Sequence, residues 1–215
     1  MEVRRADGAR RRPPYRPHQG HWTRTGIAMS LPSKPLAFAA CSVVKSEACR
    51  WLALDIGGAN LKAADGAGFA VSRPFALWRR SEELPAALAE LLAECPSADR
   101  LAITMTGELA DCFATKAEGV AAILDSVEQA ASGLAIHVYL TDGSWASSAD
   151  AKAQPLRAAA SNWHALARFA GRFLPGGTGL VIDVGSTTCD VIPVDNARVA
   201  AAGRTDPDRL IAGEM

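Results

Sequence analysis

One short frame occurs twice in the sequence, and it limits the possible folds more than any other feature. Residues 54–62 read LDIGGANLK, and residues 182–190 read IDVGSTTCD. In both copies an apolar run delivers an aspartate, Asp55 or Asp183, followed by a β-branched residue, a glycine and small or polar residues. The two aspartates lie 128 residues apart, which is about the length of one subdomain. Repetition at this scale predicts two similar units, each with a β-hairpin.

The composition of the frame is typical of a phosphate-binding turn. Glycine permits a tight turn without bulky side chains, and such a turn presents successive backbone N–H groups to an anion. Hydroxyl groups and a lysine can add further donors. The residues that we expect to contact phosphate are Gly57, Gly58, Asn60, Lys62, Gly185, Ser186, Thr187 and Thr188.

The two aspartates need a different role, because a carboxylate repels phosphate. A divalent cation with its bound waters, placed between carboxylate and phosphate, removes this conflict. We therefore expect Asp55 and Asp183 to be the catalytic acids that hold a metal, Mg²⁺ or a similar ion. The alternative is that each copy is only a β-hairpin with a polar tip. The P-loop motif and the Rossmann G-x-G-x-x-G motif are both absent.

Charge is unevenly distributed along the chain, although the formal net charge is +0. Residues 1–50 contain ten Lys or Arg and three Asp or Glu, whereas residues 51–215 contain 13 and 20. The acidic second part argues against a nucleic-acid-binding protein. Five scattered cysteines without a CxxC pair indicate neither a metal cluster nor a disulfide framework, so we expect a cytoplasmic protein. No apolar run is long enough to span a bilayer.

Residues 1–50 are rich in Arg and Pro and lack a sustained hydrophobic period, so we expect them to be disordered. Four interpretations remain open for this segment. It is a transit peptide, the end of a lipoprotein-type signal, a basic tail that binds nucleic acid, or the product of a start site placed too early.

From Trp51 onwards, strand-like and helix-like segments alternate. Strands are expected at 51–57, 60–65, 68–78, 100–107 and 135–143, and helices at 81–95, 116–132 and 158–174. In the first of these helices Ser81 is expected to be the N-cap, and Leu84, Leu88, Leu91 and Leu92 form the apolar stripe. The alternation predicts an α/β fold.

Three stretches, DIGGANLKAA at 55–64, TMTGELADCF at 104–113 and DVGSTTCDVIPV at 183–194, resemble the hydantoinase/oxoprolinase-related proteins. These belong to the actin-like ATPase superfamily, whose fold is ribonuclease H-like. The resemblance is greatest to the branch linked to tetrahydromethanopterin-dependent C1 transfer. The resemblance covers residues 51–215, beyond the segment 1–50 that we expect to be disordered or wrongly assigned, and implies a first actin-like subdomain at 51–175 and the start of a second at 176–215. Members of that branch continue beyond the final Gly-Glu-Met, so we expect the second subdomain to be incomplete.

Archaeal members of this branch are furan-methanamine synthases of methanofuran biosynthesis, which join an aminomethylfuran diphosphate to a phenol and release pyrophosphate. The resemblance therefore implies a metal-dependent transferase with a small diphosphate or nucleotide and a phenolic acceptor as its partners. Glu108 and Asp111 follow an expected buried strand, so either could accept the phenol proton, although both could instead cap a helix. The alternatives are an ATP-dependent amidohydrolase of the hydantoinase/oxoprolinase type, with ATP in the cleft, and an inactive remnant.

Overall fold

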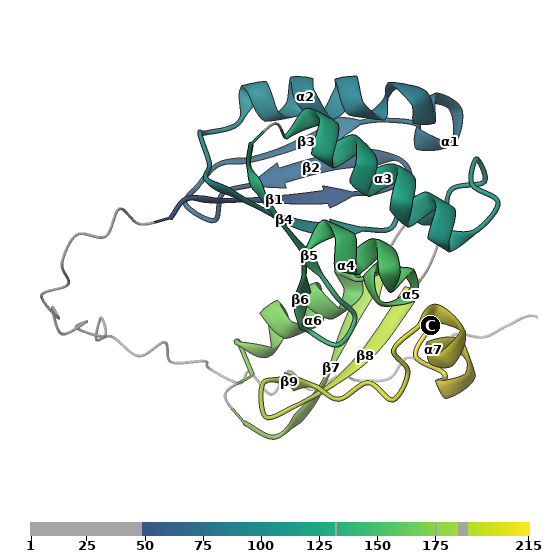
Figure 1. Ribbon diagram of the computed structural model, residues 1–215. Coiled ribbons are helices and arrows are strands. Elements are labelled where there is room, and N and C mark those ends of the chain that lie inside the picture. The colour runs from purple at the N-terminus through teal and green to yellow at the C-terminus, as the bar shows by residue number, and fades with distance from the viewer. Residues whose placement is uncertain (1–48, 132, 175, 185–188) are drawn as a thin grey trace, which may run out of the picture. The chain divides into compact units, whose positions relative to one another are not determined.

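The computed structural model describes residues 49–131, 133–174, 176–184 and 189–215, all within one compact unit of residues 45–215. Its larger sheet has six strands in the order β3-β2-β1-β4-β5-β6 (Figure 1). The strands are β1 (Trp51–Ile56), β2 (Asn60–Ala64), β3 (Ala70–Pro74), β4 (Arg100–Met105), β5 (Ala135–Tyr139) and β6 (Trp145–Ala146).

The direction of the strands changes across this sheet. Strands β1, β2 and β3 form an antiparallel meander, whereas β4 and β5 run parallel to β1 and β6 closes the other edge antiparallel to β5. Parallel neighbours require crossover connections, and helices supply them here. The mixed sheet confirms the expected α/β class.

Helices cover one face of this sheet (Figure 1). Leu52, Leu54 and Ile56 alternate along β1 and are buried on that face, where they pack into a core shared with α2 and α3. Helix α2 contributes Leu84, Leu88 and Leu91 of its expected stripe to the same core, and Leu92 is half-buried against it. The helices of the unit are α1 (Leu77–Arg80), α2 (Leu84–Glu94), α3 (Lys116–Ala130), α4 (Ser148–Ala153), α5 (Pro155–Ala158), α6 (Asn162–Gly171) and α7 (Asp206–Ala212).

A second, smaller sheet contains the strands of the second Asp-x-Gly frame. It consists of β7 (Thr178–Val184), β8 (Cys189–Asp195) and β9 (Arg198–Val199), all antiparallel. Ile192 and Val194 of β8 pack against Trp163 and Ala167 of α6 to form a separate small core. Each of the two sheets therefore carries one copy of the frame.

Several boundaries differ from the sequence-based expectations. The third strand ends at Pro74 instead of residue 78, and the chain enters α1 three residues later. Ser81 does not cap α2, since it lies in a 3₁₀ turn (Ser81–Glu83) and α2 begins at Leu84 with Pro85 in its first turn. Proline lacks an N–H and fits the first turn of a helix, which explains the later start.

The expected helix at 158–174 is also shorter than predicted. It begins at Asn162, because Ala160 adopts a left-handed backbone with φ 50° and separates α5 from α6. The expectations for residues 1–48 lie outside the described residues. Within the described part of the chain, no helix is long and apolar enough to cross a membrane.

Candidate functional site

Asp55 and Lys62 form the centre of the first hairpin. They are cross-strand partners on β1 and β2, and Lys62 Nζ lies 2.9 Å from Asp55 Oδ2. Thr104 on the neighbouring strand β4 donates its hydroxyl to Asp55 Oδ1 at 3.2 Å. The Asp55 side chain is 26% exposed and that of Lys62 is 55% exposed. Lys62 is thus available to an anion, but its charge is balanced by Asp55.

The tip of this hairpin is closed by backbone contacts. Gly57 N–H donates to the Asn60 carbonyl at 3.0 Å, and the Gly58 carbonyl accepts from the N–H of Leu77 at 2.9 Å. A Cβ atom at Gly57 would lie 3.1 Å from the Asn60 carbonyl oxygen, so a larger residue would crowd the turn. Within the described residues, the N–H groups of Gly58 and Ala59 donate to no acceptor. Two adjacent free donors in a tight turn are suited to an anion.

The second hairpin repeats this arrangement at the same register. Asp55 pairs with Lys62, seven residues later, and Asp183 pairs with Asp190, also seven residues later. The two aspartates of the second hairpin therefore lie on the same face of the smaller sheet. Asp183 is half-buried. The expected phosphate contacts Gly185, Ser186, Thr187 and Thr188 lie outside the described residues.

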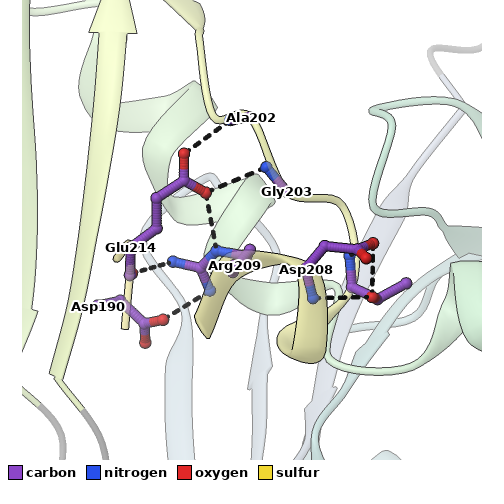
Figure 2. A network of polar contacts seen from close by, with 7 residues as sticks. Asp190, Ala202, Gly203, Asp208, Arg209 and Glu214 are labelled. Carbon is purple, nitrogen blue, oxygen red and sulfur yellow. Dashed lines mark hydrogen bonds and ion pairs between the residues drawn. The ribbon is translucent and has the colours of Figure 1, made fainter. Parts of the chain in front are cut away.

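Arg209 neutralises Asp190 (Figure 2). Its side chain is 1% exposed; Nη1 lies 2.6 Å from Asp190 Oδ1, and Nη2 donates to the Glu214 carbonyl at 2.9 Å. The guanidinium also stacks over the Trp163 ring, with Cζ 4.0 Å from the centroid. The Glu214 carboxylate accepts from the N–H groups of Ala202 and Gly203. This network ties β8, α6 and α7 together directly beside Asp183.

The Arg209 network was not expected from the sequence. In the sequence, TDPDRLIAGEM shows only an arginine and a glutamate five residues apart. Such a pattern does not say which acid pairs with the arginine, because the partner Asp190 is 19 residues away.

Glu108 is buried on the turn that follows β4. It belongs to a 3₁₀ turn (Gly107–Leu109) after β4 and is 2% exposed. Its Oε1 accepts from the N–H of Ala160 at 2.7 Å, while Oε2 has no partner among the described residues. Burial raises the pKa of this carboxyl to about 7. Asp111, in contrast, lies on an exposed turn.

The predicted site residues thus form separate groups. Asp55, Gly57, Gly58, Asn60 and Lys62 cluster at the first hairpin. Within the described ranges, no hydrogen bond or ion pair joins this hairpin to Asp183, Glu108 or Asp111. The same ranges contain no group of three His, Cys, Asp or Glu side chains that could hold a metal ion.

Comparison of the sequence with known proteins identifies the family of this chain. The model of the hydantoinase/oxoprolinase family matches residues 99–211, slightly more than half of the chain. The chain belongs to the hydantoinase/oxoprolinase family. It is also 38% identical over 168 residues to the (4-{4-[2-(gamma-L-glutamylamino)ethyl]phenoxymethyl}furan-2-yl)methanamine synthase of Methanocaldococcus jannaschii. That match covers 76% of this chain and 49% of the relative, so the family member described here spans about half the length of this relative. The resemblance expected from the three motifs is confirmed.

Proposed function

We propose that this hydantoinase/oxoprolinase-family chain contributes both phosphate hairpins of a metal-dependent transferase. The enzyme acts on a diphosphate substrate in the synthesis of a methanofuran-type cofactor for tetrahydromethanopterin-linked C1 metabolism. One observation carries the proposal: Asp55 and Asp183 occupy the same register position in two hairpins, one in each sheet. A hairpin that served only to connect two strands would not need an acid at this position twice.

We further propose that residues 51–215 have the fold of the actin-like ATPases. Support comes from the division of the unit into two sheets, each with one copy of the Asp-x-Gly hairpin at one end. In this proposal residues 51–175 form the first subdomain and residues 176–215 begin the second, and the substrate's phosphates lie between the two hairpins.

The name of the M. jannaschii relative describes a product in which a phenoxymethyl group joins an aromatic ring to a furan. Such a bond forms when a phenol oxygen attacks the methylene carbon of an aminomethylfuran diphosphate. The bond between that carbon and the diphosphate oxygen breaks, pyrophosphate leaves with the electron pair, and the phenol proton passes to a base. In this proposal the N–H groups of Gly58 and Ala59, which have no acceptor among the described residues, bind the departing diphosphate as its charge increases.

A divalent cation would stabilise the same departing charge. Mg²⁺ in such sites is bound by one or two carboxylates together with substrate phosphates and waters. Single carboxylates at Asp55 and Asp183 fit this mode, in which the ion arrives with the diphosphate. The proposed base is Glu108 or Asp111. Asp111 is already exposed, whereas Glu108 must first reach solvent.

A pyrophosphate-release assay on the full chain tests the proposal. We expect pyrophosphate from an aminomethylfuran diphosphate and a phenol, dependent on Mg²⁺. Asp183→Asn should lower the rate by about 10²-fold or more, whereas Asp195→Asn in the same sheet should not. Wild-type protein that releases no pyrophosphate under these conditions would contradict the proposal, as would an Asp183→Asn variant as active as wild type.

The family match also favours a second candidate, an ATP-dependent amidohydrolase of the hydantoinase/oxoprolinase type. In that case the two hairpins would hold the phosphates of ATP. ADP formation stimulated by hydantoin or 5-oxoproline would support this candidate. A chain that shows neither activity, and whose ligand affinities do not change with Asp183→Asn, would be a non-catalytic remnant.

A further inference from the structure

The face of the larger sheet opposite α2 and α3 carries an unusual row of small side chains. Four alanines are consecutive register partners across four neighbouring strands, with Ala70 paired to Ala64, Ala64 to Ala53, and Ala53 to Ala102. Adjacent strands lie about 4.8 Å apart, so the row extends over about 14 Å. No side chain in it extends beyond one carbon. The row forms a flat apolar floor.

A second row runs parallel to the alanines, two residues further along the same strands. It contains Ser72, Lys62, Asp55 and Thr104, which are likewise consecutive register partners. This polar row includes the ion pair at the centre of the first hairpin. The apolar floor therefore ends at a line of hydroxyl, ammonium and carboxylate groups.

Both rows line one cavity of about 810 Å³. This volume lies within the range of about 300–1,000 Å³ that is usual for small-molecule sites. Helix α6 forms a wall with Phe169, and Trp145 of β6 forms another; both aromatic side chains are more than half exposed. Exposed aromatic rings beside an apolar floor are suited to a second aromatic ring, because rings stack or meet edge to face.

The charge of the cavity differs from that of the surrounding protein. Among the described residues, its lining contains the three cations Lys62, Arg168 and Arg172 but only one acid, Asp55. Residues 51–215 as a whole contain 13 Lys or Arg and 20 Asp or Glu. A positively lined cavity in an acidic body attracts anions.

The cations are not equally available. Lys62 is paired with Asp55, and Arg168 donates to the Gly143 carbonyl at 3.0 Å. The Arg172 guanidinium, which is exposed, makes no hydrogen bond or ion pair with any other described residue. Arg172 is therefore the cation best placed to bind an incoming anion.

From these observations we infer that the cavity on the open face of the larger sheet binds a planar aromatic molecule with an anionic group. The ring lies on the alanine row between Trp145 and Phe169, and the anionic group is bound by Arg172. This inference deepens the proposed function by placing the ring-bearing substrate beside Asp55. The inference depends on the proposed function only for the identity of the natural ligand. The binding of an aromatic anion in the cavity requires no reaction.

Calorimetric titration of the full chain, without metal or diphosphate, tests the inference. The probes are 2-naphthoate, which is a planar aromatic anion, and 2-naphthamide, its neutral counterpart. We expect naphthoate to bind about fivefold more tightly, which corresponds to about 1 kcal/mol for a solvent-accessible charge pair. Arg172→Gln should abolish this preference without changing naphthamide binding. Arg198→Gln, at an exposed arginine of β9 outside the cavity, is the matched control and should retain the preference.

A second variant tests the floor. Ala53→Leu places a bulky side chain in the alanine row, on an exposed position of β1, and should weaken both probes by at least about tenfold. Circular dichroism establishes that this variant is folded; if it is not, Ala70→Leu at the edge of the row replaces it. Wild-type protein that binds neither probe would overturn the inference. Probe binding that is unchanged by both Arg172→Gln and the alanine variant would also overturn it.

The binding and pyrophosphate-release assays distinguish a failure of the cavity inference from a failure of the proposed transferase function. Naphthoate binding without pyrophosphate release would contradict the transferase and leave the cavity as a binding site. Pyrophosphate release without naphthoate binding would support the transferase and overturn the inference about the cavity.

Discussion

At the scale of single residues, Glu108 is the most unusual group of the described chain. Its carboxyl group is buried beneath α3, where a Cβ atom at Gly119 would lie only 2.7 Å from Glu108 Cα. One oxygen accepts from Ala160 N–H, and the other has no partner among the described residues. Burying an ionised carboxylate with so few donors is unfavourable, which is why its pKa is raised from 4.5 to about 7.

This shift predicts how stability depends on pH. Because the folded-state pKa of Glu108 lies above its unfolded value, the neutral carboxyl favours folding, and this contribution is complete below about pH 4.5. It is lost progressively as the pH rises to about 7. Glu108→Gln, which keeps a neutral side chain at all pH values, should therefore be more stable than wild type at pH 8 by about 3 kcal/mol. The two proteins should be of similar stability at pH 4.

Urea denaturation across this pH range measures the difference. Glu82→Gln, at an exposed glutamate of the 3₁₀ turn before α2, is the control and should leave the pH dependence unchanged. A constant difference between Glu108→Gln and wild type from pH 4 to pH 8 would show that Glu108 does not titrate within this window.

At the scale of elements, α7 depends on the buried Arg209 and the two acids beside it. Arg209 connects this short helix to Asp190 on β8 and to Glu214 after the helix. A capping box at Thr205 and Asp208 begins the helix, and Gly213, with φ 73°, ends it. A helix of seven residues is not stable alone in water, so its attachment by Arg209 decides whether it forms.

We predict that Arg209→Leu destabilises the unit by about 3–5 kcal/mol. The substitution keeps an apolar side chain over Trp163 but leaves the carboxylates of Asp190 and Glu214 without their cation. Thermal unfolding measures the loss, and hydrogen exchange should show that the amides of α7 lose protection first. The exposed Arg204, five residues earlier, provides the matched control Arg204→Leu, which should change stability by less than about 0.5 kcal/mol.

An equal effect of the two arginine substitutions would contradict this assignment. Loss of stability with α7 still protected would mean instead that Arg209 acts on β8 alone. The network also predicts a functional effect, because Asp190 is the register partner of the proposed acid Asp183. Arg209→Leu should then lower pyrophosphate release even at temperatures at which the variant is fully folded.

At the scale of the whole molecule, the smaller sheet has one apolar face open to solvent. Leu180, Ile182 and Val184 alternate along β7 and are all exposed, while Val181 packs against the small core that α6 forms with β8. Among the described strands, β7 pairs only with β8, so its other edge is unpaired. An exposed apolar strand with a free edge favours pairing with another chain.

We therefore predict that the protein associates with itself as its concentration rises. Ile182→Lys should weaken this association by about tenfold or more, because it places a charge in the apolar face at the free edge. Analytical ultracentrifugation of both proteins measures the effect. Ile211→Lys on α7, where an exposed isoleucine lies outside the sheet, is the control and should leave the association unchanged. A wild-type protein that remains monomeric at all concentrations would contradict the prediction.

Much of the fold follows from patterns that are local in the sequence. Alternation of apolar residues along 51–56 and 100–105 predicts strands buried on one face, and a spacing of three or four between Leu84, Leu88 and Leu91 predicts the helix that covers them. The repeated Asp-x-Gly frame likewise indicates two equivalent hairpins. These features were predictable because each depends on residues only a few positions apart.

Only the tertiary structure decides which distant residues meet. Arg209 finds Asp190, Glu108 binds the Ala160 backbone, and Ala53 lies between Ala64 and Ala102. None of these pairings has a local signature, since alanine, arginine and glutamate occur equally well on a solvent-exposed surface. The sequence by itself predicted the main strands and helices and the two Asp-x-Gly frames, whereas strand order and register determined the alanine row and the burial of Glu108. The physical reason is that a pKa, a buried ion pair and a cavity depend on the complete surroundings of a side chain, which exist only once the sheets have formed.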